Sequence, residues 1–189
     1  MSSLFSEIFE RSMGKKELIG IWKYDDENSF ICGYVVNYDE TLVAIKHYTE
    51  YGKPDGVMVE QISNIINIDI NDDYLISLQY IINNSKKLDK ENEIDIDFSG
   101  GEMWQFKILQ ENSERKDRIV SLEINRDESF SGFIGKVTVS DFMLKRIGKL
   151  GEDEGSVVYR VEDVTSLSIN DQDCRKRLML YNWKNSLTR

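Results

Sequence analysis

One long motif occurs twice in this chain, and it constrains the fold more than any other feature. The first copy runs from Phe30 to Asp72 and the second from Phe130 to Asp171. In each copy an apolar strand with a glycine precedes a polar turn, a second strand, a loop with two glycines and two more short apolar strands. Each copy ends in Asn-Asp before an apolar helical pattern, where the aspartate can cap the helix. The repeat predicts two structural units of the same kind.

A further strand precedes each copy, which gives each unit five short strands. Apolar and polar residues alternate over Glu17–Tyr24 and again over Arg118–Ile124. Polar turns join these strands to the repeated motif. Because five strongly bent antiparallel strands leave unprotected edges unless they close, we expect each unit to form a small barrel. An outer strand is expected at Val57–Ile62 in the first unit and at Val157–Val161 in the second.

Helices are predicted at three places. Apolar residues from Leu4 to Met13 recur at helical spacing, with Ser3 or Ser6 as the N-cap and Gly14 at the end. Helical patterns also follow each copy, over Tyr74–Ile82 and Cys174–Ser186. We expect all three to pack against the barrels.

The segment between the two units has no counterpart in the first half of the chain. Residues 84–92 are polar and rich in lysine, as expected of a linker. Alternation over Glu93–Phe98, a Ser99–Gly101 turn and the apolar Met103–Leu109 predict an extra β-hairpin. The predicted divisions are therefore a first unit over 1–83, a linker and hairpin over 84–117, and a second unit over 118–189.

Two spacings in the repeat indicate a family. Asp39 follows Gly33 by six residues, and Asp141 follows Gly135 at the same spacing. Together with two apolar series, these residues make the chain resemble the Sm-like barrel of the SH3-type small β-barrels. The resemblance implies an all-β protein with two tandem Sm-like five-stranded barrels and short flanking helices, and the hairpin predicted from the residues adds to these. The apolar series are Val59, Ile62, Ile65, Ile68 and Val158, Val161, Val164, Leu167.

Sm-like proteins are known for binding RNA in rings, but the residues of that pocket are not retained. In the family an aromatic residue two positions after the aspartate stacks on a base, an asparagine four positions after it reads the base edge, and an Arg-Gly pair completes the pocket. Neither copy has an aromatic residue to provide the ~1–3 kcal/mol that stacking contributes per base. The resemblance therefore implies the fold without the RNA pocket. The matching positions are Thr41, Val43 and Gln61–Ile62 in the first copy and Met143, Lys145 and Arg160–Val161 in the second.

Charge is distributed unevenly along the chain. The net charge is −10, which disfavours non-specific nucleic-acid binding because such binding depends on neutralising phosphates. Residues 1–83 hold six Lys or Arg against fourteen Asp or Glu. Basic residues gather in the second half, where they form a candidate surface for a polyanion or a partner; the alternative is a solvated helix face. The candidate residues are Lys145, Arg146, Lys149, Arg160, Arg175, Lys176 and Arg177.

The sequence predicts that the protein is not an enzyme and needs no cofactor or metal. His47 is the single histidine, which excludes a His-dependent triad or a multi-His metal site within one chain. Asp72 and Asp171 are expected to be helix caps and not paired catalytic carboxylates. Cys32 and Cys174 are expected to be free thiols. We expect a cytoplasmic protein, because the chain shows no signal peptide and no apolar run of membrane-spanning length.

Three functions are consistent with these features. The first is a non-catalytic binding or assembly module that contacts proteins through exposed strand edges, including those of further copies of itself. The second is an RNA-binding Sm-like protein that uses the basic second half. The third is an acidic inhibitor of the immunity type, which blocks a basic partner by charge complementarity. No membrane partner is expected.

Overall fold

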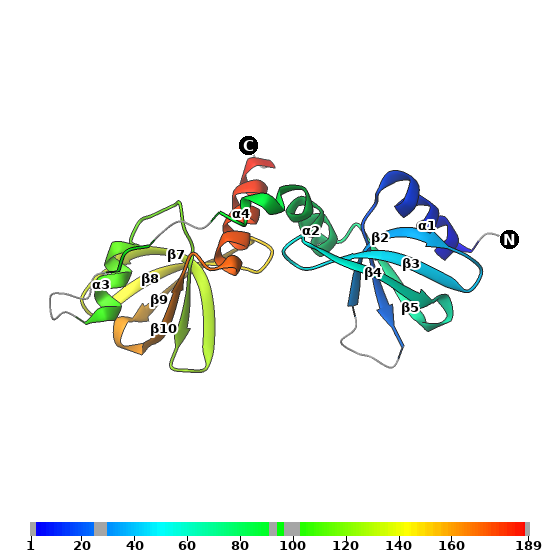
Figure 1. Cartoon of the computed structure of the whole chain (residues 1–189). Coiled ribbons are helices and arrows are strands. Elements are labelled where there is room, and N and C mark those ends of the chain that lie inside the picture. Colours follow the sequence, from blue (N-terminus) through cyan, green and yellow to red (C-terminus); the bar gives the residue numbers. More distant parts are fainter. Residues whose placement is uncertain (1–2, 25–29, 91–93, 97–102, 188–189) are drawn as a thin grey trace. The chain divides into compact units, whose positions relative to one another are not determined.

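Two compact units, Met1–Lys87 (unit 1) and Leu88–Arg189 (unit 2), make up the chain (Figure 1). The computed structural model describes residues 3–24, 30–90, 94–96 and 103–187. Each unit contains one five-stranded antiparallel sheet with short helices, as the repeat predicted. No helix in these ranges is long and apolar enough to cross a membrane.

In unit 1 the strands of the sheet are ordered β4-β3-β2-β1-β5. A helix precedes the first strand, a short 3-10 turn separates the fourth strand from the fifth, and a second helix follows the sheet. The elements are α1 (Leu4–Lys15), β1 (Ile19–Lys23), β2 (Phe30–Tyr38), β3 (Leu42–Tyr48), β4 (Pro54–Gln61), η1 (Ile62–Asn64), β5 (Ile65–Ile70), α2 (Asp73–Asn84) and η2 (Ser85–Lys87).

The sheet of unit 2 has the same order, β9-β8-β7-β6-β10. Within the described ranges neither sheet closes on itself, since the outer strands of each sheet pair on one side alone. The elements are α3 (Trp104–Glu111), β6 (Val120–Ile124), β7 (Glu128–Val137), β8 (Asp141–Ile147), β9 (Asp153–Arg160), η3 (Val161–Asp163), β10 (Val164–Ile169) and α4 (Gln172–Leu187).

The strand registers show which residues of the two units correspond. Gly33 lies between Ile19 and His47 in the sheet, and Gly132 lies between Val120 and Arg146. The predicted match of Gly33 with Gly135 is therefore wrong, and Gly132 is its counterpart. The same numerical spacing then holds through every later element, up to Asp72 and Asp171.

A close approach of neighbouring strands explains why Gly33 and Gly132 are the corresponding residues. A Cβ atom at Gly33 would lie 2.2 Å from the carbonyl oxygen of Lys46, and one at Gly132 would lie 2.1 Å from that of Lys145. At Gly135 the nearest atom would be 3.4 Å away, on Met143, which is an ordinary contact distance. Strand packing therefore requires glycine at the first two positions and not at Gly135.

The predicted match of Asp39 with Asp141 is wrong for a related reason. Asp39 N–H donates to the carbonyl of Leu42, and Thr138 N–H donates in the same way to the carbonyl of Asp141. Thr138 is therefore the counterpart of Asp39. Its hydroxyl oxygen accepts from the Asp141 N–H at 2.9 Å, whereas the Asp39 carboxylate accepts from the Leu42 N–H at 2.8 Å. A hydroxyl and a carboxylate serve here as alternative acceptors in the same turn.

The extra hairpin is not formed. Residues 94–96 are not in a strand, the predicted second strand is the helix α3, and the predicted turn lies outside the described residues. As a helix, α3 buries Ile108 and Leu109 and packs on β7, just as α1 packs on β2. Short apolar segments satisfy helical and strand spacing alike. Since α3 matches α1, each unit consists of a helix, five strands and a second helix.

Each unit has its own apolar core between the sheet and the preceding helix. Phe9 of α1 is fully buried in the core of unit 1, and Leu109 of α3 in that of unit 2. A smaller cluster lies under α4, where Phe133 and Tyr181 pack on buried Ile119, Ile147 and Cys174.

The second helix of each unit begins at the predicted aspartate cap. Asp72 accepts from the Leu75 N–H at 2.7 Å, and Asp171 accepts from the Cys174 N–H at 2.7 Å. Each cap satisfies an N–H group that lacks a partner within the helix. The helix α1 begins after Ser3 as predicted, but it continues past Gly14 and ends at Lys15, with Lys16 as its C-cap at a φ of 54°.

Candidate binding surfaces

The outer edge of β4 exposes a run of three apolar side chains. Val57, Met58 and Val59 are 61%, 36% and 60% exposed. Among the described residues, β4 pairs with β3 alone. An exposed, apolar and unpaired edge is a template for another strand, because its backbone N–H and C=O groups have no partner in the sheet. We call Val57–Val59 the β4 edge.

The corresponding edge of unit 2 is less apolar. By the strand register, Ser156, Val157 and Val158 of β9 are the counterparts of Val57, Met58 and Val59. Val158 is 61% exposed, so both outer strands extend beyond their cores. The difference between the edges is therefore one of side-chain chemistry and not of backbone position.

The β4 edge lies next to polar and charged groups of β3 and β1. His47, on β3, has its Nδ1 atom 3.3 Å from a carboxylate oxygen of Asp55. The carboxylate of Glu60 forms an ion pair with Lys23 Nζ at 3.3 Å. These contacts leave an acidic residue on each side of the apolar run.

The structure does not bring the seven predicted basic residues together. Lys145 Nζ lies 2.9 Å from Asp153 Oδ2 and donates to Tyr181 Oη at 2.9 Å. Arg160 pairs across the sheet with Asp141, four residues from Lys145 along β8, or about 13 Å at the usual rise of a strand. Arg160 also lies 3.4 Å from Glu162. Arg146 packs over the ring of Phe130, and Lys149 is exposed in the turn between β8 and β9.

Of the three basic residues that were predicted on α4, Arg175 and Arg177 hold the helix against neighbouring backbone, and Lys176 pairs within the helix. Arg175 donates to the carbonyls of Leu88 and Asn170, and Arg177 donates to the carbonyl of Ile147 at 3.0 Å. The side chain of Lys176 is 8% exposed and lies 3.1 Å from Asp173. Such contacts use donors that a phosphate would need, so this cluster is neither a free basic patch nor a fully solvated helix face.

The Sm-like resemblance assigns base reading to Val43 in unit 1 and to Lys145 in unit 2, but Lys145 is not the counterpart of Val43 in the strand register. Val43 is fully buried, and its counterpart by the corrected register is Phe142, which is 1% exposed. A buried apolar side chain cannot hydrogen-bond to a base edge. The register therefore removes this position from any RNA-binding surface in both units.

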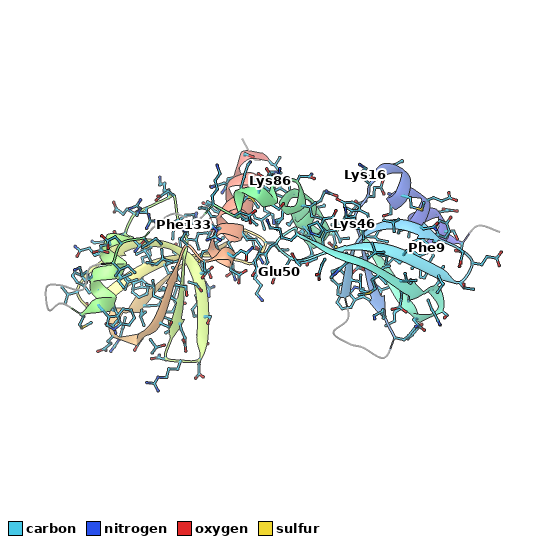
Figure 2. The ribbon with its side chains drawn as sticks, in the orientation of Figure 1. Phe9, Lys16, Lys46, Glu50, Lys86 and Phe133 are labelled. Atoms are coloured by element: carbon cyan, nitrogen blue, oxygen red, sulfur yellow. The ribbon has the colours of Figure 1, made fainter. Side chains whose placement is uncertain are left out.

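Unit 2 contains a groove of which the sequence indicated one residue, Lys145. It has a volume of about 960 Å³ and lies between β7, β8, α4 and the connection that follows α3. Phe133, labelled in Figure 2, lies on β7 with its ring centre 5.2 Å from that of Tyr181 on α4. The hydrogen bond to Tyr181 and then that to Asp153 raise the pKa of Lys145, which remains a cation in the groove. We call this site the unit 2 groove; it is lined by Glu114, Arg115, Lys116, Phe133, Ile134, Gly135, Lys145, Tyr181, Asn182 and Asn185.

The cysteines are poor nucleophiles. Both are free and buried. Burial, and to a smaller extent the charge of Asp72, raises the pKa of the Cys32 thiol to about 12, and burial likewise raises that of Cys174. Since the thiolate is the reactive form, neither thiol is activated at neutral pH. Among the residues that the structure describes, no three His, Cys, Asp or Glu side chains are grouped as metal ligands.

Comparisons with protein-family models, with curated proteins and with solved structures find no match.

Proposed function

We propose that the protein is a non-catalytic protein-binding module in which the β4 edge accepts an extended segment of a partner as an additional strand. The observation that carries this proposal is the exposure of Val57, Met58 and Val59 on an unpaired edge. Strand addition obtains affinity from main-chain hydrogen bonds and specificity from alternate side chains.

We also propose that each unit is a small, incompletely closed barrel of the Sm-like, SH3-type class. The shared strand order, the helix before the first strand and the 3-10 turn before the fifth support this assignment. The two sheets also bend at equivalent bulges, next to Lys46 in β3 and next to Lys145 in β8. Bulges of this kind bend a strand and increase its twist. The fold alone carries no activity.

The chemistry of the edge defines the partner segment. Val57 and Val59 lie on one face of β4 and Met58 on the other, because side chains alternate along a strand. The partner strand therefore carries apolar residues at alternate positions. The excess of acidic residues in unit 1 favours basic residues on either side of that segment, since complementary charge speeds association and selects against acidic partners. An acidic inhibitor of a basic protein would be one form of this function.

Selection of peptides from a displayed random library tests this proposal directly. We expect the full chain to enrich extended peptides with alternating apolar residues and basic ends. The double variant V57K/V59K places two charges on the edge and should abolish their binding, because lysines on an edge strand oppose the addition of another strand. V158K changes the counterpart of Val59 in unit 2 and is the matched control, which should bind as the unmodified protein does. Binding that survives V57K/V59K would refute the proposal.

A further inference from the structure

We infer that the unit 2 groove binds a small organic anion that carries an aromatic ring. This site is separate from the β4 edge, so the inference stands independently of the proposed protein-binding function. It rests on the charge of the groove, its aromatic wall and a glycine that leaves it open.

Positive charge gathers in the groove although the chain is acidic. Arg115, Lys116 and Lys145 line it together with one carboxylate, that of Glu114, in a chain with a net charge of −10. Two carboxylates outside the lining also contact these cations, Asp117 at Arg115 and Asp153 at Lys145. The Lys145 ammonium has three N–H groups and uses two of them, on Tyr181 and Asp153. Arg115 binds Asp117 through Nε and Nη2, which leaves the N–H groups of Nη1. Donors from two separate elements are thus available to one anion.

An aromatic wall lies beside these cations. Phe133 and Tyr181 are tilted by 59° to each other, which presents ring faces and edges and not a closed stack. Aromatic rings prefer such edge-to-face and offset contacts. The amide of Asn182, on the next residue of α4, adds hydrogen-bonding groups at the same wall. A flat ring joined to a carboxylate or phosphate matches this combination of groups.

Comparison with unit 1 shows that the groove is not a by-product of the fold. The counterpart of Gly135 is Val36, and the counterpart of Tyr181 is Ile82. Since strand packing does not require glycine at Gly135, its effect is to leave the groove without a side chain at that point. The hydroxyl of Tyr34, which stands where Phe133 stands, is bonded to Gln79 at 2.7 Å.

The connection that supplies two of the cations is also specific to unit 2. Between α1 and β1 the chain has the three residues Lys16–Leu18, whereas residues 112–119 connect α3 to β6. Arg115 and Lys116 lie in this longer connection. Backbone hydrogen bonding fixes the connection against β7, because the Glu114 N–H donates to the Ile134 carbonyl at 2.8 Å.

Titration of the isotope-labelled full chain, followed by NMR, tests the inference with four compounds. Phenyl phosphate and benzoate carry both features, inorganic phosphate lacks the ring, and benzyl alcohol lacks the charge. We expect the amide signals of Phe133, Gly135 and Lys145 to shift with one or both of the first two compounds, and which of them binds more tightly identifies the anionic group. Inorganic phosphate and benzyl alcohol should bind at least about tenfold more weakly. Equal binding of all four, or shifts confined to other residues, would overturn the inference.

Three variants locate the binding in the groove. The exposed-loop double variant R115E/K116E should weaken binding about tenfold. G135V introduces the side chain that unit 1 has at this position and should weaken binding by obstruction. K86E/K87E makes the same change of charge in unit 1, where both lysines are exposed (Lys86 is labelled in Figure 2), and should leave binding unchanged. If K86E/K87E weakens binding as much as R115E/K116E does, or if G135V has no effect, the groove is not the site.

Discussion

The two units share a strand order, a register and a pair of helix caps, but they differ on their surfaces. Positions that must be buried, or must lack a side chain, are alike: Gly33 and Gly132 allow the same close approach of strands. Asp72 and Asp171 cap the corresponding helices α2 and α4. Unit 1 adds an apolar edge and an excess of acidic residues, whereas unit 2 adds a longer connection and a basic groove. The fold tolerates these changes because they affect neither core. We therefore propose that the two units bind different ligands.

The largest expected effect is the loss of stability when a glycine that strand packing requires is replaced. Replacement of Gly135, which strand packing does not require, should cost much less. G132A should destabilise the protein by about 3 kcal/mol, because the added Cβ would overlap a carbonyl oxygen of β8. G33A should do the same in unit 1. G135A should cost less than about 0.5 kcal/mol. Urea denaturation measures all three, and a larger effect for G135A than for G132A would contradict the register that relates the two units.

The two helix caps should be equivalent. D72A and D171A each remove an acceptor bonded at 2.7 Å, and each should cost about 1 kcal/mol. Denaturation followed by circular dichroism measures the loss, with D73A as the control in α2, since Asp73 lies beyond the cap position. A cost at one aspartate alone would show that the second helix contributes differently in the two units.

An ion pair present in one unit alone gives a smaller effect. Asp153 lies 2.9 Å from Lys145, whereas the counterparts of these residues, Pro54 and Lys46, cannot form such a pair. Because both partners are partly exposed, D153N should cost about 0.5 kcal/mol or less. The loss should vanish near 1 M salt, where the Debye screening length falls to about 3 Å. Denaturation at low and high salt checks this, and a cost that persists at high salt would point to lost hydrogen bonds and not to lost charge.

The turn after β2 in unit 1 should lose stability at low pH because of Asp39. The residue of unit 2 that corresponds to Asp39 should give no such response. The N–H groups of Thr41 and Leu42 and the hydroxyl of Thr41 donate to Asp39 and hold the pKa of its carboxyl below the ordinary 3.8. A lowered folded pKa means that this stabilisation is present above about pH 4 and is lost as the pH falls through the folded pKa. NMR titration of the Asp39 carboxyl measures the pKa, and a value at or above 3.8 would contradict the turn geometry. The counterpart, Thr138, has no group that titrates in this range.

Much of the fold could be predicted because strands and turns are encoded locally. Alternating apolar residues and polar turns identified the ten strands of the two sheets, and the aspartates before apolar helical runs identified both caps. The segment Met103–Leu109 was misassigned because its apolar residues fit a strand as well as a helix, and packing on β7 decides between them. The match of Gly33 with Gly135 failed because the close approach that requires glycine involves a partner strand, which residue spacing does not reveal.

The candidate surfaces also differ in how far local sequence reveals them. The β4 edge lies within a strand that was predicted to be an outer one, and its apolar run is continuous in sequence. The unit 2 groove was missed because Arg115, Phe133, Lys145 and Tyr181 come from four separate segments. The available signals were Lys145, which was named as a candidate for polyanion binding, and the long polar connection after α3. The basic residues of α4 misled for the opposite reason, since clustering in sequence does not show that their donors are used by carbonyls of the same unit.

Hydrogen–deuterium exchange of the full chain, with and without a selected peptide, tests most directly the claim that units of the same fold bind through different surfaces. Added strands protect backbone N–H groups that were open to solvent. We predict slower exchange in β4, over Pro54–Gln61, and unchanged exchange in its counterpart β9, over Asp153–Arg160. Protection of β9, or equal protection of both outer strands, would contradict the account.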